Sequence, residues 1–530
     1  MTLRSTHPGT SDTPEACPSG TCPQGQVPRL LAAPNWNDPM RFLLFHPHKP
    51  LRSHLALLLI GFALPAASWA QQDISDRLWQ GTEQRARQLQ QEAAPSDADE
   101  RRTNAGLTEL SQDPYDRLQT LTLSILDAVN QRDWFGADRL LRQYAQVPRH
   151  DPALFDFVKA SRLAADERYT EAIETYQAVL RTNPGFLRGL LDLGQILYLD
   201  GRLKEADTTF RQLRSQSLPN EIQQFINEYI GAIERRQQWQ FSLSADWVHE
   251  DNLNQASTYV DACALVLAGS CFSNKPGEKI SDSGTYFEAS ANKLWALSGH
   301  HGLLFRSINY GNQYYHEDDY NNLVSINSLG YQYSSARNQF QLLPTFEYDN
   351  EGGHRAYHSF GLRASFSRQL TPRAQLEASL EYKDRHFSDR FNFLQGNYRS
   401  ASLFGTYMLQ PSMQLYGMLT WRDSDAESKT LAYHENIARV GIYKVFGDQL
   451  TVNLAYGHRR KHAEAANFLF NGRRQKDREN TIYLGITVPR LAWQGLTPSF
   501  SYEYRNNHSN IPHAYSYEKN RVTLGLRKIF

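Results

Sequence analysis

From about residue 239 to its end, the chain alternates apolar and polar residues in segments of strand length. In the closing segment Val522, Leu524 and Phe530 fall on one face, whereas Arg521 and Arg527 fall on the other. Because successive side chains of a strand point to opposite sides of a sheet, such a segment suits lipid on one face and water on the other. One segment alone would equally fit an ordinary half-buried strand, so the number of repetitions decides.

The pattern recurs fourteen times. Segments of period two are expected at about 239 to 249, 283 to 295, 301 to 315, 320 to 334, 338 to 349, 355 to 370, 374 to 386, 397 to 410, 412 to 424, 433 to 446, 450 to 462, 477 to 490, 496 to 508 and 516 to 530. An even number of antiparallel strands is typical of bacterial outer-membrane barrels. The sequence therefore predicts a transmembrane β-barrel of about fourteen strands, against the alternative of a soluble β-sandwich or propeller.

The joints between these segments alternate in length. Joints after even-numbered segments are short, as at 335 to 337 and 447 to 449, whereas most joints after odd-numbered segments are longer and more polar, as at 250 to 282, 387 to 396 and 463 to 476. Outer-membrane barrels have short periplasmic turns and longer extracellular loops. Both ends of the barrel are therefore expected on the periplasmic side.

Charged residues recur on the face opposite the apolar one, and a packed soluble core would not accept them unpaired. We expect these side chains to face the lumen: Glu377, Glu381, Glu503, Arg505, Arg521 and Arg527. The terminal Phe530 is expected to act as the assembly signal read by the barrel assembly machinery. The barrel would then have two partners, this machinery and the lipid of the outer membrane.

The N-terminal part has the features of an exported protein. Basic residues precede the apolar run Leu55 to Leu64, which is followed by Ser68 and Ala70 at the −3 and −1 positions of a cleavage site. Residues 1 to 70 are therefore interpreted as a leader with a signal peptide cleaved after Ala70, and Met40 is its expected true start. Residues 71 to 113 are a polar lead-in with little apolar content.

Composition limits the possible partners and cofactors. The formal net charge is zero, which gives no indication of a nucleic-acid partner. Cys263 and Cys271 lie close together in the first long loop and are expected to form a disulfide in an oxidising compartment. A metal site is the alternative for this pair, but no histidine is near and two ligands are too few. We expect no metal and no cofactor.

Between the lead-in and the barrel, the hydrophobic period changes from 2 to 3.6. Two stretches repeat with a spacing of 34 residues and share small and large positions. The first has Ala160, Leu163, Ala172, Tyr176 and Val179; the second has Gly194, Leu197, Ala206, Phe210 and Leu213; a weaker earlier copy has Ile125, Ala128, Ala137, Leu141 and Tyr144. Residues 114 to 236 are therefore predicted to form a helical, tetratricopeptide (TPR)-like periplasmic domain, with a generic helical bundle as the alternative. The fold class is α+β, with the barrel at residues 237 to 530.

Signal, short TPR domain and C-terminal barrel together resemble the surface lipoprotein assembly modulator (Slam) family, the outer-membrane translocons of type XI secretion. The sharpest local likeness is the motif at the end of the first strand, which contains Asp251, Asn252 and Asn254. For these three residues the resemblance implies gating or contact with a client at the rim. Capping of a turn is the alternative, because short polar side chains bond their own backbone at strand ends.

The resemblance implies a protein located in the outer membrane, with its N-terminal domain in the periplasm. Its TPR repeats would engage a client lipoprotein or a secreted haemophore-like protein, and its barrel would pass that client to the cell surface. An exopolysaccharide-export porin and a plain solute channel are the alternatives. An enzyme is not expected, because no Ser/His/Asp grouping or metal-ligand spacing rises above chance. The adjacent His300 and His301 are interpreted as a solvated pair at a turn.

Overall fold

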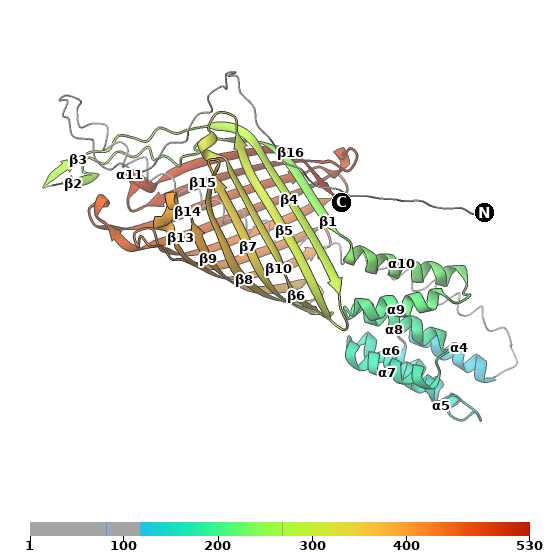
Figure 1. Ribbon diagram of the computed structural model, residues 1–530. Helices are drawn as coiled ribbons and strands as arrows, with labels where there is room; N and C mark the ends of the chain where they lie inside the picture. The colour runs from blue at the N-terminus through green and yellow to red at the C-terminus, as the bar shows by residue number, and fades with distance from the viewer. Residues whose placement is uncertain (1–80, 82–116, 268) are drawn as a thin grey trace, which may run out of the picture. The chain divides into compact units, whose positions relative to one another are not determined.

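The computed structural model describes residue 81, residues 117 to 267 and residues 269 to 530. The predicted leader, 1 to 70, and all of the lead-in, 71 to 113, apart from residue 81, lie outside the described residues. Within the described part, a run of helices is followed along the chain by a β-barrel (Figure 1).

Helices form the part of the described chain that precedes the first strand. They pack as consecutive pairs, α4 with α5, α6 with α7 and α8 with α9, and α10 packs on α9. Their bounds are α4 Arg117–Asn130, α5 Trp134–Tyr144, α6 Ala153–Ala165, α7 Tyr169–Thr182, α8 Leu187–Leu199, α9 Leu203–Arg214 and α10 Asn220–Gln237. The weaker first copy of the predicted repeat is thus a complete helix pair, and the domain contains three pairs.

Small residues at the repeat positions allow the helices of each pair to approach closely. Ala137, Ala172 and Ala206 are completely buried in the helical core. At Gly194 an added Cβ would lie 3.0 Å from the ring of Phe210, which is tighter than most real Cβ contacts. The spacing of small and large residues in the sequence therefore corresponds to close helix packing, as in TPR repeats.

Fourteen strands close into one antiparallel barrel, in which each strand pairs with the next and β1 pairs with β16 (Figure 1). The strand bounds are β1 Gln240–Glu250, β4 Asp282–Ala296, β5 His301–Tyr314, β6 Asn322–Ser334, β7 Asn338–Glu351, β8 His354–Thr371, β9 Ala374–Phe387, β10 Gly396–Gln410, β11 Met413–Ser424, β12 Tyr433–Phe446, β13 Leu450–Asn467, β14 Arg473–Thr487, β15 Thr497–Ser509 and β16 Tyr517–Ile529. A small hairpin, β2 Leu265–Leu267 and β3 Ser270–Phe272, lies in the first long loop. The prediction of an α+β chain with a fourteen-stranded barrel is confirmed.

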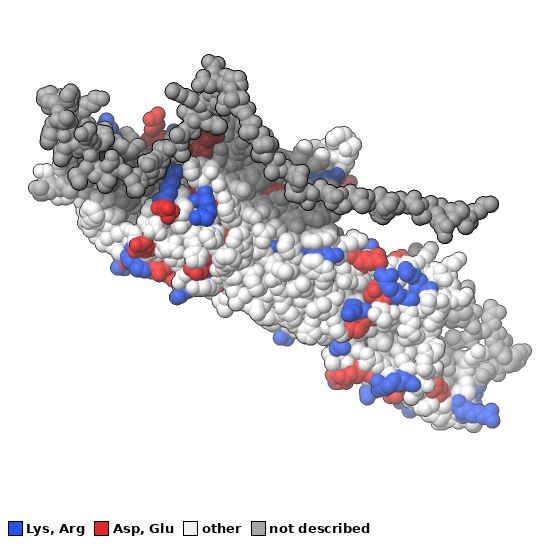
Figure 2. Space-filling view, in the orientation of Figure 1, with Lys and Arg blue, Asp and Glu red and all other residues white. Residues whose placement is uncertain are grey.

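Apolar side chains cover the outside of the barrel. The inner face carries mainly small or polar side chains, together with a buried apolar cluster on β5 to β7 that includes Ile308, Val324 and Leu343. In β1, Leu243 and Trp247 are 49% and 41% exposed, whereas Ser244 and Val248 between and beside them are buried. The middle of the barrel wall that is visible in Figure 2 carries few charged side chains. This distribution suits a wall surrounded by lipid.

One predicted loop is wrong. The segment 463 to 476 was expected to be a loop, but β13 continues to Asn467 and β14 begins at Arg473, so that only a short turn separates them. The start of β14, residues 473 to 476, carries polar residues on both faces, and the end of β13, residues 463 to 467, is mostly alanine. Where a barrel strand extends beyond the lipid, its outer face meets water, and the alternation that marks a strand in the sequence disappears.

Candidate functional site

The paired helices form a cavity of about 270 Å³ that is open to solvent. Its lining comes from α4 to α8 and from α10, and it includes Asn130, Trp134, Tyr176, Arg188, Asp192 and Gln195. Stacked helix pairs present a concave surface of this kind, and such surfaces bind segments of other proteins. The cavity is therefore the candidate site for recognising a polypeptide.

Several residues that line this cavity contact one another through polar groups. The hydroxyls of Ser161 and Tyr176 lie 2.9 Å apart, and the Tyr176 hydroxyl donates to Asp192 at 3.4 Å. Arg188 Nε lies 2.9 Å from Asp192 Oδ1, one helical turn away. Burial raises the pKa of the Asp192 carboxyl, and the guanidinium of Arg188 opposes that rise. The lining thus offers hydroxyl, carboxyl, guanidinium and amide groups, which can bond to a peptide backbone.

Inside the barrel, charged side chains form ion pairs. Lys383 lies 2.6 Å from Glu347 and 3.5 Å from Glu381. Arg363 also pairs with Glu381, at 3.7 Å. All four side chains are buried, as expected for residues that pack against one another on the inner face. The inner wall is therefore polar but largely neutralised at this level.

The other residues expected in the lumen also lie on inner faces. Arg505 Nε donates to Glu503 Oε1 at 2.7 Å, and both are buried. Arg527 donates to Glu288 at 3.1 Å, across from β16 to β4. Glu377 is also buried. These inward positions follow from the alternation of side chains along each strand.

An interior space of about 640 Å³ remains between these charged groups. Its lining includes Asp246, Glu288, Arg439, Glu503, Arg521 and Arg527. Gly81, from the N-terminal part of the chain, lines it as well. Apolar side chains such as Phe404 and Phe500 line the same space, so the barrel contains an open space of mixed polar and apolar lining.

The motif at the end of β1 fastens the first loop to β16. Asp251 accepts hydrogen bonds from the backbone and side-chain nitrogens of Asn520, each at 2.7 Å. Asn252 is completely buried and donates to the backbone oxygen of Glu518 at 2.9 Å. Asn254 donates to the backbone oxygen of Glu278 at 2.9 Å, within the first loop. The three side chains thus stabilise the loop at the junction between the first and last strands.

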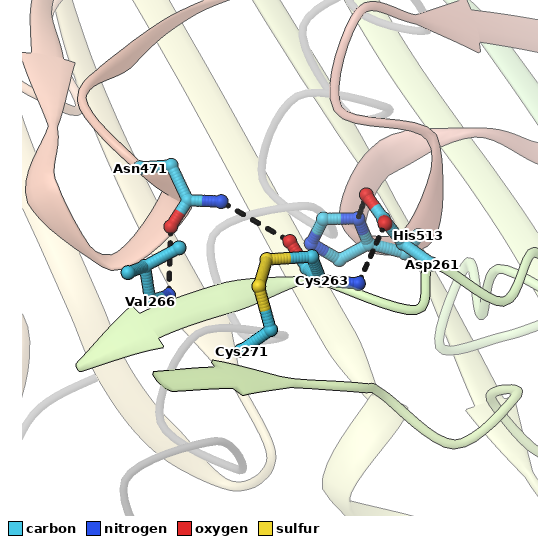
Figure 3. Close-up of a disulfide and its surroundings, with 6 residues drawn as sticks. All are labelled: Asp261, Cys263, Val266, Cys271, Asn471 and His513. Carbon is cyan, nitrogen blue, oxygen red and sulfur yellow. Dashed lines mark hydrogen bonds and ion pairs between the residues drawn. A yellow bond between two sulfur atoms is a disulfide. The ribbon is translucent and has the colours of Figure 1, made fainter. Parts of the chain in front are cut away.

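A disulfide joins Cys263 and Cys271, whose Cα atoms are 4.8 Å apart, across the β2–β3 hairpin (Figure 3). Asn471, from the β13–β14 turn, accepts from the backbone nitrogen of Val266 at 2.8 Å and donates to the backbone oxygen of Cys263 at 3.2 Å. His513, from the β15–β16 loop, lies 3.5 Å from Asp261. Three connections at the loop end of the barrel are therefore joined to one another.

Two family models match the chain. The model described as surface lipoprotein assembly modifier matches residues 239–530, and the model for the N-terminal TPR repeats of the same proteins matches residues 107–210. The first match alone covers more than half of the chain. The chain belongs to the surface lipoprotein assembly modifier family.

Individual relatives agree with this assignment. The hemophilin secretion modulator of Acinetobacter baumannii is 26% identical over 440 residues, which cover 79% of this chain and 87% of that protein. Surface lipoprotein assembly modifier 1 of Haemophilus influenzae is 24% identical over 415 residues, covering 77% and 84%. Among solved structures, the outer-membrane channel DcaP of A. baumannii covers 55% of this chain and 96% of its own, at 9% identity and a TM-score of 0.33, a likeness too remote to support any conclusion.

Contacts between the helices and the turns of the barrel are features of this family member that the sequence did not indicate. Glu205 of α9 accepts from the backbone nitrogen of Gly299 at 2.6 Å, and His300 Nε2 lies 2.8 Å from Asp200 Oδ2. The interpretation of the two histidines as a solvated pair is therefore wrong for His300, whereas His301 is exposed, with its Nδ1 2.6 Å from the Tyr331 hydroxyl. A histidine at a turn carries no signal in the sequence for a partner that lies 100 residues away along the chain.

Two further observations apply to the part of the chain that the structure describes. No group of three histidine, cysteine, aspartate or glutamate side chains there is placed to hold a metal ion. Nor does that part contain a helix with the length and apolar character needed to cross a membrane.

Proposed function

We propose that this protein is an outer-membrane translocon that assists the export of a client lipoprotein, or of a secreted haemophore-like protein, to the cell surface. The observation that carries the proposal is the continuity of α10 with β1. Through it, the helical cavity is tethered at the end of a barrel whose interior space is lined in part by charged side chains. The names of the relatives, surface lipoprotein assembly modifier and hemophilin secretion modulator, support this assignment. No enzymatic step and no nucleic acid are part of the proposal.

In this scheme the helical domain, residues 114 to 236, holds a segment of the client, and the barrel, residues 237 to 530, passes it. A domain held directly before β1 raises the effective concentration of its client at the barrel. We propose that Asp251, Asn252 and Asn254 act at the rim by holding the first loop in place over the β1–β16 junction, where a passing client would meet it.

The alternatives fit the domain organisation less well. An exopolysaccharide porin would need a long TPR array, and only three helix pairs precede the barrel in the described residues. A plain solute channel would leave the helical cavity without a role.

Removing the helical domain tests the proposal. Cells that keep residues 237 to 530 behind the signal should still insert the barrel, yet display less client on their surface at unchanged total client, because the tether is lost. The measurement is protease shaving of intact cells, followed by blotting for the client encoded by a neighbouring gene. A full-length strain and a null strain are the controls.

Each alternative predicts a different outcome of this experiment. A solute channel predicts no change in any surface protein, and a polysaccharide porin predicts loss of exopolysaccharide. Unchanged surface exposure of the client in both the truncated and the null strain would rule out export by this protein.

We propose two further partners, the lipid around the barrel wall and the barrel assembly machinery, with Phe530 as the assembly signal. The Phe530 ring is exposed, while its backbone nitrogen donates to the Phe241 oxygen at 2.9 Å. The backbone of Phe530 is thus paired with β1 while its ring stays exposed. Before the barrel enters the membrane, the assembly machinery could contact this ring.

Substituting Phe530 by aspartate should lower the amount of heat-modifiable protein in outer membranes. The backbone bonds to Phe241 persist in this variant, so that the loss would report on the side chain. Phe530→Tyr keeps the aromatic ring and should insert normally. Normal insertion of both variants, measured by gel mobility with and without boiling, would contradict the role of Phe530.

A further inference from the structure

The outer wall of strands β12 to β15 carries basic side chains near the loop end of the barrel. We propose that they bind the phosphate groups of a phosphorylated lipid, of the lipid A kind, in the outer leaflet. Strand register places these side chains, here called the basic cluster, in two adjacent rows: Arg460, Arg478 and His508 in one, and His434, His462 and Lys476 in the next.

The basic cluster points away from the lumen. In β13 and β14, Lys461 and Asp477 are almost completely buried, whereas Arg460, Lys476 and Arg478 are exposed. Successive side chains of a strand point to opposite faces. Since the buried set faces the barrel interior, the exposed set faces the surroundings of the barrel.

The cluster lies just beyond the apolar part of the wall. Tyr456 in β13 is 46% exposed and lies opposite Ile482, which in turn lies opposite Tyr504. Rows containing exposed aromatic residues mark the interface of a barrel with the lipid headgroups. Arg460 follows Tyr456 by four residues, a rise of about 14 Å along the strand, or about 10 Å across the membrane for a strand tilted by about 45°. Acyl chains can therefore contact the aromatic row while phosphates reach the cluster.

The positive charges of the cluster face one another. Arg460 lies directly opposite Arg478, and like charges in this position destabilise a strand pair. Arg460 Nε donates to His458, which is not acidic. Within the described residues, no carboxylate forms an ion pair with Arg460, Lys476 or Arg478. A bound phosphate would remove this repulsion, and guanidinium groups match its oxygens in a fork geometry.

Among the described residues, the acidic groups nearest to the cluster lie at its margins. Glu518 of β16 lies opposite Asn506, two residues from His508 along β15. Glu464, further along β13, lies 3.6 Å from Lys429, and Asp423 of β11 lies opposite His434. Asp423 also lies opposite Arg399 of β10. Arg399 is thus an outward-facing arginine with an acidic neighbour, and it provides a matched control for Arg460 and Arg478.

Retention of lipid by the purified full-length protein tests the proposal. In native mass spectrometry from detergent, wild type and Arg399→Gln should retain bisphosphorylated lipid A. The double variant R460Q/R478Q should retain about tenfold less, because it loses two charge-assisted contacts. All variants should stay heat-modifiable, which shows that their barrels are folded. If the double variant does not fold, Lys476→Gln takes its place, and it is expected to retain less lipid A than wild type.

Different lipids distinguish the sources of phosphate. Lipid A without its phosphates should bind weakly to wild type, and millimolar inorganic phosphate should leave bisphosphorylated lipid A bound. Complete displacement by inorganic phosphate would overturn the lipid assignment in favour of a free anion. Equal retention of lipid A by wild type and R460Q/R478Q would overturn the site itself. None of these readouts depends on protein export.

Discussion

Replacing Glu250 with glutamine should lower the free energy of unfolding of the barrel by roughly 3 to 5 kcal/mol. Glu250 lies at the end of β1, is almost completely buried, and forms ion pairs with Lys519 and Arg521 of β16. Its carboxylate also accepts a hydrogen bond from the Tyr314 hydroxyl at 2.7 Å. The amide would leave two cations without their counter-charge in a site that water hardly reaches, at the one junction that closes the barrel.

The measurement is urea unfolding of the protein in detergent micelles. Unfolding is monitored on unboiled gels, where the folded and unfolded forms run as separate bands. Glu464→Gln is the matched control, because it removes a carboxylate whose pair with Lys429 is largely open to water. Exposed pairs contribute about 0 to 1 kcal/mol, so its midpoint should hardly move. Equal midpoints for the two variants would show that the Glu250 contacts do not hold the β1–β16 junction.

The second large effect is expected in the helical domain, where Phe210→Ala should cost roughly 3 to 5 kcal/mol. Phe210 is completely buried, stacks on Tyr229 of α10 with ring centroids 4.8 Å apart, and fills the space above Gly194. Its removal would leave a cavity where α8, α9 and α10 meet, next to the helix that continues into the barrel. Such a loss is a large part of the stability of a small domain.

Residues 114 to 236 expressed alone allow this test by thermal melting followed with circular dichroism. The wild-type segment should be helical, and Phe210→Ala should melt at a markedly lower temperature. Phe135→Ala is the control, since Phe135 is 77% exposed. A β-rich spectrum of the wild-type segment, or equal melting of both variants, would contradict the domain assignment or the role of Phe210.

Features with a local signal were predictable from the sequence. The alternation of side chains in strands is a property of neighbouring residues, so the strands appear in the sequence wherever lipid and water lie on opposite faces. The same rule failed at 463 to 476, where water surrounds both faces. In the helical domain, Ala137 indicated the first helix pair correctly, although this copy of the repeat has the weakest sequence pattern. The burial of its side chains shows that the pair is complete. Burial depends on the neighbouring helices, so the sequence of the copy does not record it.

Local patterns of residues were enough to predict the class of each part of this protein: strands with an apolar outer face, helices with small residues at TPR spacing, and two neighbouring cysteines. The contacts between distant side chains became visible only in the folded chain. Asp251 accepts a hydrogen bond from Asn520, and Glu250 forms an ion pair with Arg521. Strand register places Arg460 opposite Arg478. Register and barrel closure depend on pairings between strands that can lie at opposite ends of the chain, as β1 and β16 do, and no local pattern of residues records them.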